Sequence, residues 1–180
     1  MSRLQVYSEN DPKTPLLSTS DGDAMRSALI EIGVSFERWP TRPISDLSEA
    51  AVLTTYAEEV SALRAKGGYR SIDVVSVTPD HPDRATMRAK FLSEHTHAED
   101  EVRFFVSGEG LFTLHHDDRV FDVLCTQGDL MLVPAGMRHW FDMGASPQFT
   151  AIRMFVNPDG WVAGFTGDAI SDRFPRHEPT

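Results

Sequence analysis

The sequence has one cysteine, no long apolar segment and too few basic residues to balance its acidic ones. Because Cys125 is the only cysteine in 180 residues, no disulfide can form within the chain, and a reducing cytoplasm is the expected location. No apolar run approaches the roughly 18 residues that cross a bilayer, and residues 1–4 do not begin a secretory signal. Lysine and arginine number 17 against 27 aspartate and glutamate, a formal net charge of −10. This charge disfavours nucleic acid and membrane surfaces as partners.

The remaining composition is that of an ordinary folded protein. Hydrophobic residues make up 41% of the chain and charged residues 24%, which argues against global disorder. A chain of this length can bury one core, so we expect a single domain over residues 1–180. In this setting Cys125 is expected to be a small buried hydrophobe and not a nucleophile.

The pattern of the first 90 residues predicts a mostly helical segment. Apolar residues recur at helical spacing over 21–32, and Gly33 follows them. A second helix is expected over 46–66, capped by Asp46 with Glu49 three residues later, and a short third helix over 83–90. Residues 72–77 form the one expected strand of this part.

From residue 91 onward the pattern changes to short alternating strands separated by turns. The predicted strands are 102–106, 110–115, 119–123, 130–133 and 149–156. Turn signals lie at 107–110 and at 116–119, the second as in a hairpin. Many short strands at even spacing predict a β-sandwich or barrel.

The most informative local pattern is His95-Thr96-His97, followed by Glu101. Histidines one residue apart lie on the same face of a strand. Imidazole nitrogens together with a carboxylate suit a divalent transition metal. Paired histidines are also common on solvated strand faces, so this motif alone does not decide between the two interpretations.

A second segment favours the metal site. Leu130 to Val133 form an apolar strand that ends in Pro134-Ala135-Gly136, and His139 follows three residues after the glycine. Proline fixes φ and glycine tolerates positive φ, so the segment predicts a tight turn that places His139. Three histidines and one carboxylate would leave two positions of a six-coordinate ion open for substrate.

The two segments together resemble the two motifs of the cupin family, with Ala89 and Met143 where that family has glycine and asparagine. Residues 90–161 further resemble acireductone dioxygenase, an enzyme of methionine salvage. The resemblance implies a mainly β fold with flanking helices, an antiparallel cupin-type jelly roll. Residues 1–90 would form the mostly helical flank, and residues 91–160 the barrel core with the metal site. It identifies the metal ligands as His95, His97, Glu101 and His139.

Strand parity suggests which other side chains share the metal-facing side. If the strand stays regular after Glu101, Arg103 and Phe105 share its face, whereas Val102, Phe104 and Val106 point toward the helices. An arginine inside a small barrel requires negative charge nearby, either the ligand carboxylate or a substrate enolate. We therefore predict a catalytic role for Arg103, with pairing to a structural acid as the alternative.

The resemblance also implies a substrate pocket for an apolar methylthio group. Its expected lining is Phe91, Phe105, Phe141, Arg153 and Trp161, although an internal salt bridge is the alternative for Arg153.

Several polar residues near the motifs are expected to lie outside the site. Glu99 is expected to be a surface charge. Asp100 is expected to be a carboxylate that could orient a ligating histidine. Glu94 could lie at the rim or behind a ligand. The remaining histidines, next to acidic or proline-containing segments, are expected to be solvated: His81, His115, His116 and His177.

The implied function is cleavage of the acireductone 1,2-dihydroxy-3-keto-5-methylthiopentene by O2, with one Fe(II) or Ni(II) per monomer. Iron would yield 4-methylthio-2-oxobutanoate and formate, and nickel 3-methylthiopropanoate, formate and carbon monoxide. The expected partners are this small molecule and O2, without nucleic acid or membrane, and the expected state is a monomer. Two alternatives remain open, a cupin sugar isomerase and a non-enzymatic metal- or small-molecule-binding cupin. The sequence identifies no general base.

Overall fold

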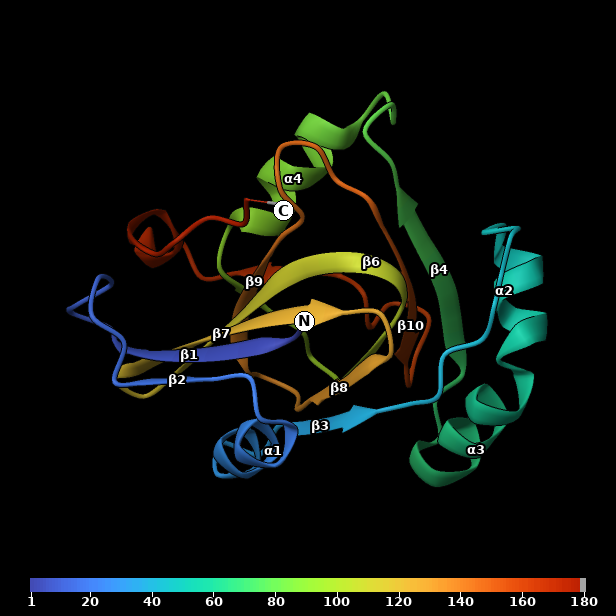
Figure 1. The fold of residues 1–180 in the computed structure, drawn as a ribbon, viewed down its shortest axis with the longest axis horizontal. Coiled ribbons are helices and arrows are strands. Elements are labelled where there is room, and N and C mark those ends of the chain that lie inside the picture. Colours follow the sequence, from blue (N-terminus) through green and yellow to red (C-terminus); the bar gives the residue numbers. More distant parts are fainter. Residues whose placement is uncertain (179–180) are drawn as a thin grey trace.

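The computed structural model describes residues 1–178, which form a β-barrel of two facing sheets with helices on its outside (Figure 1). The strands are β1 Arg3–Ser8, β2 Leu17–Thr19, β3 Ser35–Arg38, β4 Ser71–Val77, β5 His95–Thr96, β6 Glu101–His116, β7 Arg119–Thr126, β8 Asp129–Val133, β9 Arg138–Asp142, β10 Phe149–Phe155 and β11 Gly164–Phe165. The helices are α1 Gly22–Ile30, α2 Glu49–Thr55, α3 Ala57–Gly67, α4 Arg84–Leu92 and the 3₁₀ helix η1 Ile170–Arg173.

Strand β6 joins the two sheets. Its first half lies between β8 and β10, with β3 beyond β8 and β4 beyond β10. Its second half lies between β7 and β9, and β1, β2, β5 and β11 extend that sheet. All these pairings are antiparallel, which is the strand arrangement expected of a jelly roll.

The turn predicted at 107–110 is wrong, because β6 runs through it without a break. The pairing with β10 shifts register there: Thr150 faces Ser107, whereas the next residue, Ala151, faces Phe105. Such a bulge bends a strand and increases its twist. Gly108 takes φ of 72° at this point, and a Cβ on it would lie 1.8 Å from the backbone oxygen of Gln148. The glycine therefore marks the bend at which β6 passes from one sheet to the other.

The expectation of helices with a single strand in the first 90 residues was incomplete. The short strands β1 and β3 pair with the late strands β7 and β8, and β2 pairs with β1. Strands of three to six residues carry little periodic signal of their own, and β1 and β3 are stabilised by partners about 90 to 120 residues away. The predicted helix 46–66 is also two helices, because Tyr56 leaves helical geometry between α2 and α3. Ser48 caps α2, whereas Asp46 accepts a bond from the Ser48 amide.

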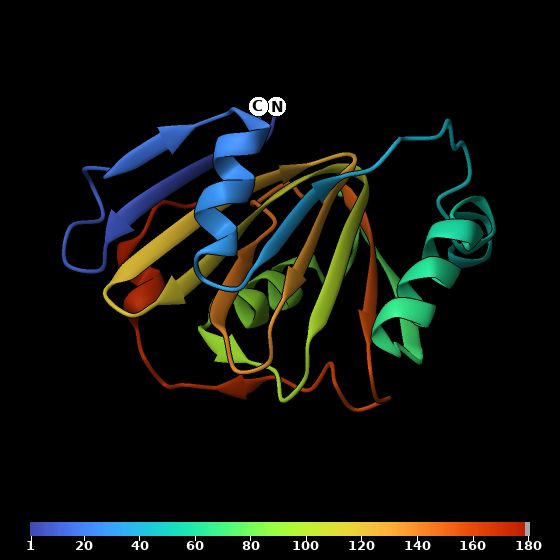
Figure 2. The same cartoon turned by 90° about the horizontal axis from the view of Figure 1, so that it is seen from below.

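The other predicted helices are confirmed. Asp21 caps α1, and its side chain accepts a hydrogen bond from the Ala24 amide at 2.8 Å. Helix α4 begins after Asp83 and ends at Leu92, so that the chain then enters β5 and its histidine. This helix lies against β9 at one opening of the barrel (Figure 2).

One apolar core fills the inside of the barrel, and another lies between the barrel and the helices that cover it. The inner core contains Phe105, Phe112, Phe141 and Met131, and Met25 and Leu29 of α1 join it. In the second core, α2 and α3 cover the outer face of β4, β10 and β6 (Figure 1). The side chains of β6 in this outer core are Val102, Phe104 and Val106, as strand parity predicted.

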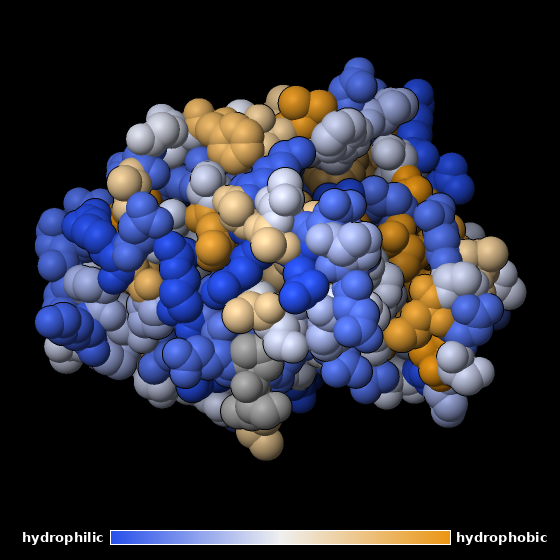
Figure 3. Space-filling model, turned by 90° about the horizontal axis from the view of Figure 1, so that it is seen from above, coloured by the Kyte–Doolittle hydropathy of each residue, from blue (hydrophilic) through white to orange (hydrophobic). Residues whose placement is uncertain are grey.

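The face in Figure 3 is mainly hydrophilic, with hydrophobic side chains in separate patches. None of the helices in residues 1–178 has the length and apolar character that crossing a membrane requires. Cys125 is fully buried in the inner core, as expected of a small hydrophobe.

Candidate metal centre and substrate cavity

Three histidines from β5, the segment after it and β9 converge at one end of the barrel. His95 and His139 are directly paired across β5 and β9, and His97 follows two residues after His95. One ring nitrogen from each of the three lies within 4.8 Å of those of the others. All three side chains are buried. The structure therefore brings together the three histidines that the two sequence motifs predicted.

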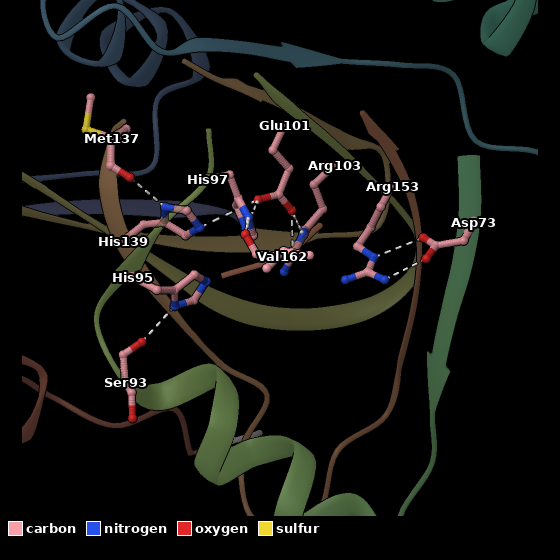
Figure 4. Close-up of polar contacts among 10 residues, drawn as sticks. All are labelled: Asp73, Ser93, His95, His97, Glu101, Arg103, Met137, His139, Arg153 and Val162. Carbon is pink, nitrogen blue, oxygen red and sulfur yellow. Dashed lines mark hydrogen bonds and ion pairs between the residues drawn. The ribbon is translucent and has the colours of Figure 1, made fainter. Parts of the chain in front are cut away.

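The orientation of each imidazole is set by a backbone carbonyl at its Nδ1 (Figure 4). The acceptors are Ser93 O for His95 (2.7 Å), Val162 O for His97 (3.2 Å) and Met137 O for His139 (2.8 Å). Because a carbonyl only accepts, each Nδ1 must carry the proton, which leaves Nε2 of a neutral ring with a free lone pair. Such carbonyl contacts are the usual means by which proteins orient metal-binding histidines.

Glu101 supplies an oxygen next to these nitrogens. Its Oε2 lies 3.4 Å from His97 Nε2 and 3.6 Å from His139 Nε2. Among residues 1–178, Oε2 and the buried Nε2 of His139 have no hydrogen-bond partner. An unpaired buried polar atom costs about 1–3 kcal/mol, so two of them facing each other indicate a site that can hold a cation. Three nitrogens and one carboxylate oxygen fit a divalent transition metal.

The surroundings keep Glu101, His139 and His95 in the protonation states that bind metal. Burial by itself raises the pKa of Glu101, but Arg103 and the neighbouring histidines outweigh it and lower that pKa to about 2. Burial lowers the pKa of His139 to about 3, against the opposing effect of Glu101. Burial likewise lowers the pKa of His95. At neutral pH the imidazoles of His95 and His139 are thus neutral and the carboxylate of Glu101 is ionised.

Arg103 lies on the metal-facing side of β6, where strand parity placed it. Its Nη2 and Nε donate to Glu101 Oε1 at 2.6 and 3.1 Å, so this oxygen is occupied while Oε2 faces the histidines. The guanidinium carbon also lies 5.0 Å from the ring centre of Phe112 and 4.8 Å from that of Phe141. Arg103 thus pairs with the predicted ligand carboxylate, one of the two negative charges expected beside it, and its catalytic role stays a prediction.

A cavity of about 250 Å³ opens beside the histidines. Four of the five predicted pocket residues line it, together with the three histidines and Arg103: Phe91, Phe141, Arg153 and Trp161. Trp161 is half exposed at the rim. Phe105 does not line the cavity, because it is fully buried in the inner core behind Phe141. The walls thus combine aromatic side chains with two arginines and Lys90.

Two of the predicted surface histidines are buried, which corrects the sequence interpretation. His115 is 3% exposed, and its Nδ1 lies 2.6 Å from Glu94 Oε2. Glu94 is also buried, and its other oxygen accepts a bond from the Thr166 hydroxyl at 2.8 Å. His177 is 7% exposed, and its amide donates to Asp142. Their acidic and proline-containing neighbours suggested solvent, but partners distant in sequence cover both rings.

The two acidic residues between His97 and Glu101 accept hydrogen bonds from the backbone of neighbouring loops. Asp100 is exposed and accepts a bond from the Ala135 amide at 2.8 Å, so the expectation that it orients a ligating histidine is wrong. Glu99 is half-buried and accepts bonds from the amide and the side chain of Asn157. It therefore anchors the segment after β10 and is not a free surface charge.

The fold and the site together define a metal-binding protein of the cupin class, as predicted. The ARD/ARD′ family model matches residues 5–163, and the chain belongs to this family of acireductone dioxygenases. A relative of that name from Stenotrophomonas maltophilia is 51% identical and covers 100% of this chain and 98% of its own. One from Pseudomonas aeruginosa is 54% identical, with coverage of 97% and 98%.

A solved structure agrees with the family assignment. It is described as acireductone dioxygenase from Bacillus anthracis with a cadmium ion in its active center. The two chains superpose with a TM-score of 0.79 at 31% identity, over 92% of this chain and 98% of the other. The chain is accordingly a metal-dependent enzyme, and the family predicted from the histidine motifs is confirmed.

Proposed function

We propose that this protein cleaves the acireductone 1,2-dihydroxy-3-keto-5-methylthiopentene with O2 in methionine salvage, using one Fe(II) or Ni(II) bound by His95, His97, Glu101 and His139. The observation that carries the proposal is the convergence of three buried imidazoles beside the carboxylate of Glu101. Among residues 1–178, Glu101 Oε2 and His139 Nε2 are buried there without a hydrogen-bond partner. The names of the relatives support the substrate. The cadmium in the neighbouring structure supports a divalent ion.

The cavity residues match the parts of this substrate. The aromatic rings of Phe91, Phe141 and Trp161 would hold the methylthio end, because apolar surface gains from leaving water. Arg103 would stabilise the negative charge of the deprotonated enediol, and its aromatic neighbours strengthen this by excluding water. When bound, the divalent ion would supply Lewis-acid stabilisation of the substrate oxygens and orient them.

The donor set is compatible with either metal. Affinity for a site of nitrogen and oxygen ligands follows the order Fe(II) below Ni(II), so purified protein would favour nickel at equal supply. With iron the products would be 4-methylthio-2-oxobutanoate and formate. With nickel they would be 3-methylthiopropanoate, formate and carbon monoxide.

The test is aerobic decay of freshly generated acireductone, followed by the loss of its enol absorbance. Metal-stripped protein is compared before and after loading with Fe(II) or Ni(II), with His139→Ala as the inactive control. Metal-dependent decay with O2 uptake and formate release supports the proposal, and carbon monoxide should appear only with nickel. Tight metal binding without O2 uptake would contradict it and favour a cupin isomerase or a non-enzymatic binding protein.

We further propose that the chain works in the cytoplasm as a monomer of one domain. The three histidines converge within one chain, so the proposed metal centre needs no ligand from a second copy. The early strands β1 and β3 are hydrogen-bonded to the late strands β7 and β8, which supports one cooperative unit. Light scattering should give a mass of 20.1 kDa, and unfolding should be a single transition. A stable dimer or two transitions would contradict this.

A further inference from the structure

Three charged side chains form one row across three neighbouring strands. Asp73 on β4 is directly opposite Arg153 on β10, and Arg153 is directly opposite Arg103 on β6. Directly paired residues of antiparallel strands project from the same face of the sheet. The order across the sheet is therefore carboxylate, guanidinium, guanidinium, and this face is the metal-facing one.

Two arginines side by side are unfavourable unless other groups offset their repulsion. Each is held by its own carboxylate through the same two atoms. Arg153 donates from Nε and Nη2 to the two oxygens of Asp73 at 2.9 and 2.6 Å. Arg103 donates from the corresponding atoms to Glu101. In both cases the carboxylate takes the Nε–Nη2 edge of the guanidinium, so Nη1 is not used in the pair (Figure 4).

Both arginines line the cavity beside the histidines, and both also line a second, much smaller cavity of about 10 Å³ together with Phe91. We propose that Asp73 is a positioning residue that holds Arg153 beside Arg103, so that the two guanidiniums together bind a small dianion with oxygens on adjacent carbons. This deepens the proposed function and rests on it, because a doubly deprotonated enediol is such a dianion.

The exposure of the pair explains why Arg153 requires an anchor. The side chain of Asp73 is 44% exposed and that of Arg153 is 17% exposed, so water can compete for this guanidinium. The side chain of Arg103 is 11% exposed, and its partner Glu101 is 1% exposed, so the difference between the two pairs lies mainly in the carboxylates. Without Asp73, repulsion from Arg103 and the gain in rotamer freedom would move Arg153 toward solvent.

Asp73→Asn separates positioning from simple charge balance, because the two make opposite predictions. Removal of a negative charge beside the cavity should tighten anion binding if only net charge mattered. If Asp73 positions Arg153, binding should weaken, by about tenfold or more for a contact displaced by an ångström. Glu59→Gln is the matched control, since it breaks an arginine–carboxylate pair, with Arg42, that lies away from the cavity.

The probe is oxalate, titrated at pH 8 into metal-free protein and followed by the ¹⁵N guanidinium resonances of arginine. We expect oxalate to shift the resonances of both Arg103 and Arg153 in the wild type and in Glu59→Gln. In Asp73→Asn the dissociation constant should rise about tenfold, and the Arg153 shift should be lost. Arg153→Lys, which keeps the charge but not the fork that Asp73 binds, should behave like Asp73→Asn.

Unchanged or tighter oxalate binding in Asp73→Asn would overturn the inference, as would equal weakening in Glu59→Gln. The same variants are then assayed with acireductone after metal loading. A rise in KM larger than the fall in kcat is expected for Asp73→Asn. Because the oxalate titration needs neither metal nor turnover, it still tests the arginine pair if the wild type does not cleave acireductone.

Discussion

Asp122 provides a sharp test of how burial affects the stability of this barrel. It lies on β7 and is 3% exposed, and its carboxyl accepts a bond from the Thr113 hydroxyl at 2.7 Å. Burial raises its pKa from 3.8 to about 7, because Thr113 and the charge of Arg3 offset the loss of hydration only in part. The folded protein therefore holds a proton on Asp122 at a pH at which the unfolded chain has released it.

The sign and size of the effect follow from that difference. Between pH 4 and 7 the folded state binds more protons than the unfolded state, so the Asp122 contribution to the free energy of unfolding falls as pH rises. A difference of about three pKa units corresponds to about 4 kcal/mol above pH 7. Asp122→Asn keeps the shape but cannot ionise. We therefore expect the advantage of the variant over wild type to grow by about 2.5 kcal/mol between pH 5 and pH 8, because part of the total of about 4 kcal/mol is already lost at pH 5, above the unfolded pKa.

The assay is urea unfolding of both proteins at pH 5 and pH 8, each in the same metal-free buffer. Only the change in the difference between variant and wild type is used, because other groups also titrate in this range. Asp80→Asn, at an exposed position, is the control and should show no pH-dependent difference. A difference for Asp122→Asn that is the same at both pH values would refute the reasoning. Asp122 would then be ionised in the folded state.

Two further predictions concern the metal and the bend of β6. His139→Ala should reduce bound metal from about one ion per chain to less than a tenth of an ion, because it removes a buried ligand. The bound metal is measured by mass spectrometry after dialysis. An equal loss of metal in His116→Ala, a substitution of a partly exposed histidine, would contradict the assignment. Gly108→Ala should lower the free energy of unfolding by about 3 kcal/mol, because it adds a steric clash to positive φ. Gly136→Ala, with similar φ but open space around it, should cost only about 1 kcal/mol. Equal costs for the two glycines would show that the clash relaxes freely.

The centre of the site could be predicted from sequence because its geometry is local. His95, His97 and Glu101 lie within seven residues, and strand parity alone places Arg103 on the same side. Pro134 and Gly136 similarly indicate the turn that delivers His139. The same parity rule predicted which residues of β6 face the helices. In each case the relevant spacing is a property of a short backbone segment, and distant residues do not change it.

The environment of these residues could not be predicted, because it depends on pairings across the whole chain. Asp73 and Arg153 are 80 residues apart, and neither has a local motif that indicates the other. His115 follows the alternation of β6, yet its burial depends on Glu94 and Glu9, from two other parts of the chain. The strand parity rule says which face a residue takes, but not whether that face is covered.

The orientation of the three imidazoles combines both kinds of information. His95 and His139 each contact a carbonyl two residues earlier in the chain, those of Ser93 and Met137, so local backbone geometry orients them. His97 contacts Val162, 65 residues later, and therefore depends on the segment between β10 and β11. That segment also carries Trp161 at the cavity rim. A single stretch of chain thus orients one predicted metal ligand and closes one side of the substrate cavity, which couples the geometry of the metal centre to the shape of the pocket.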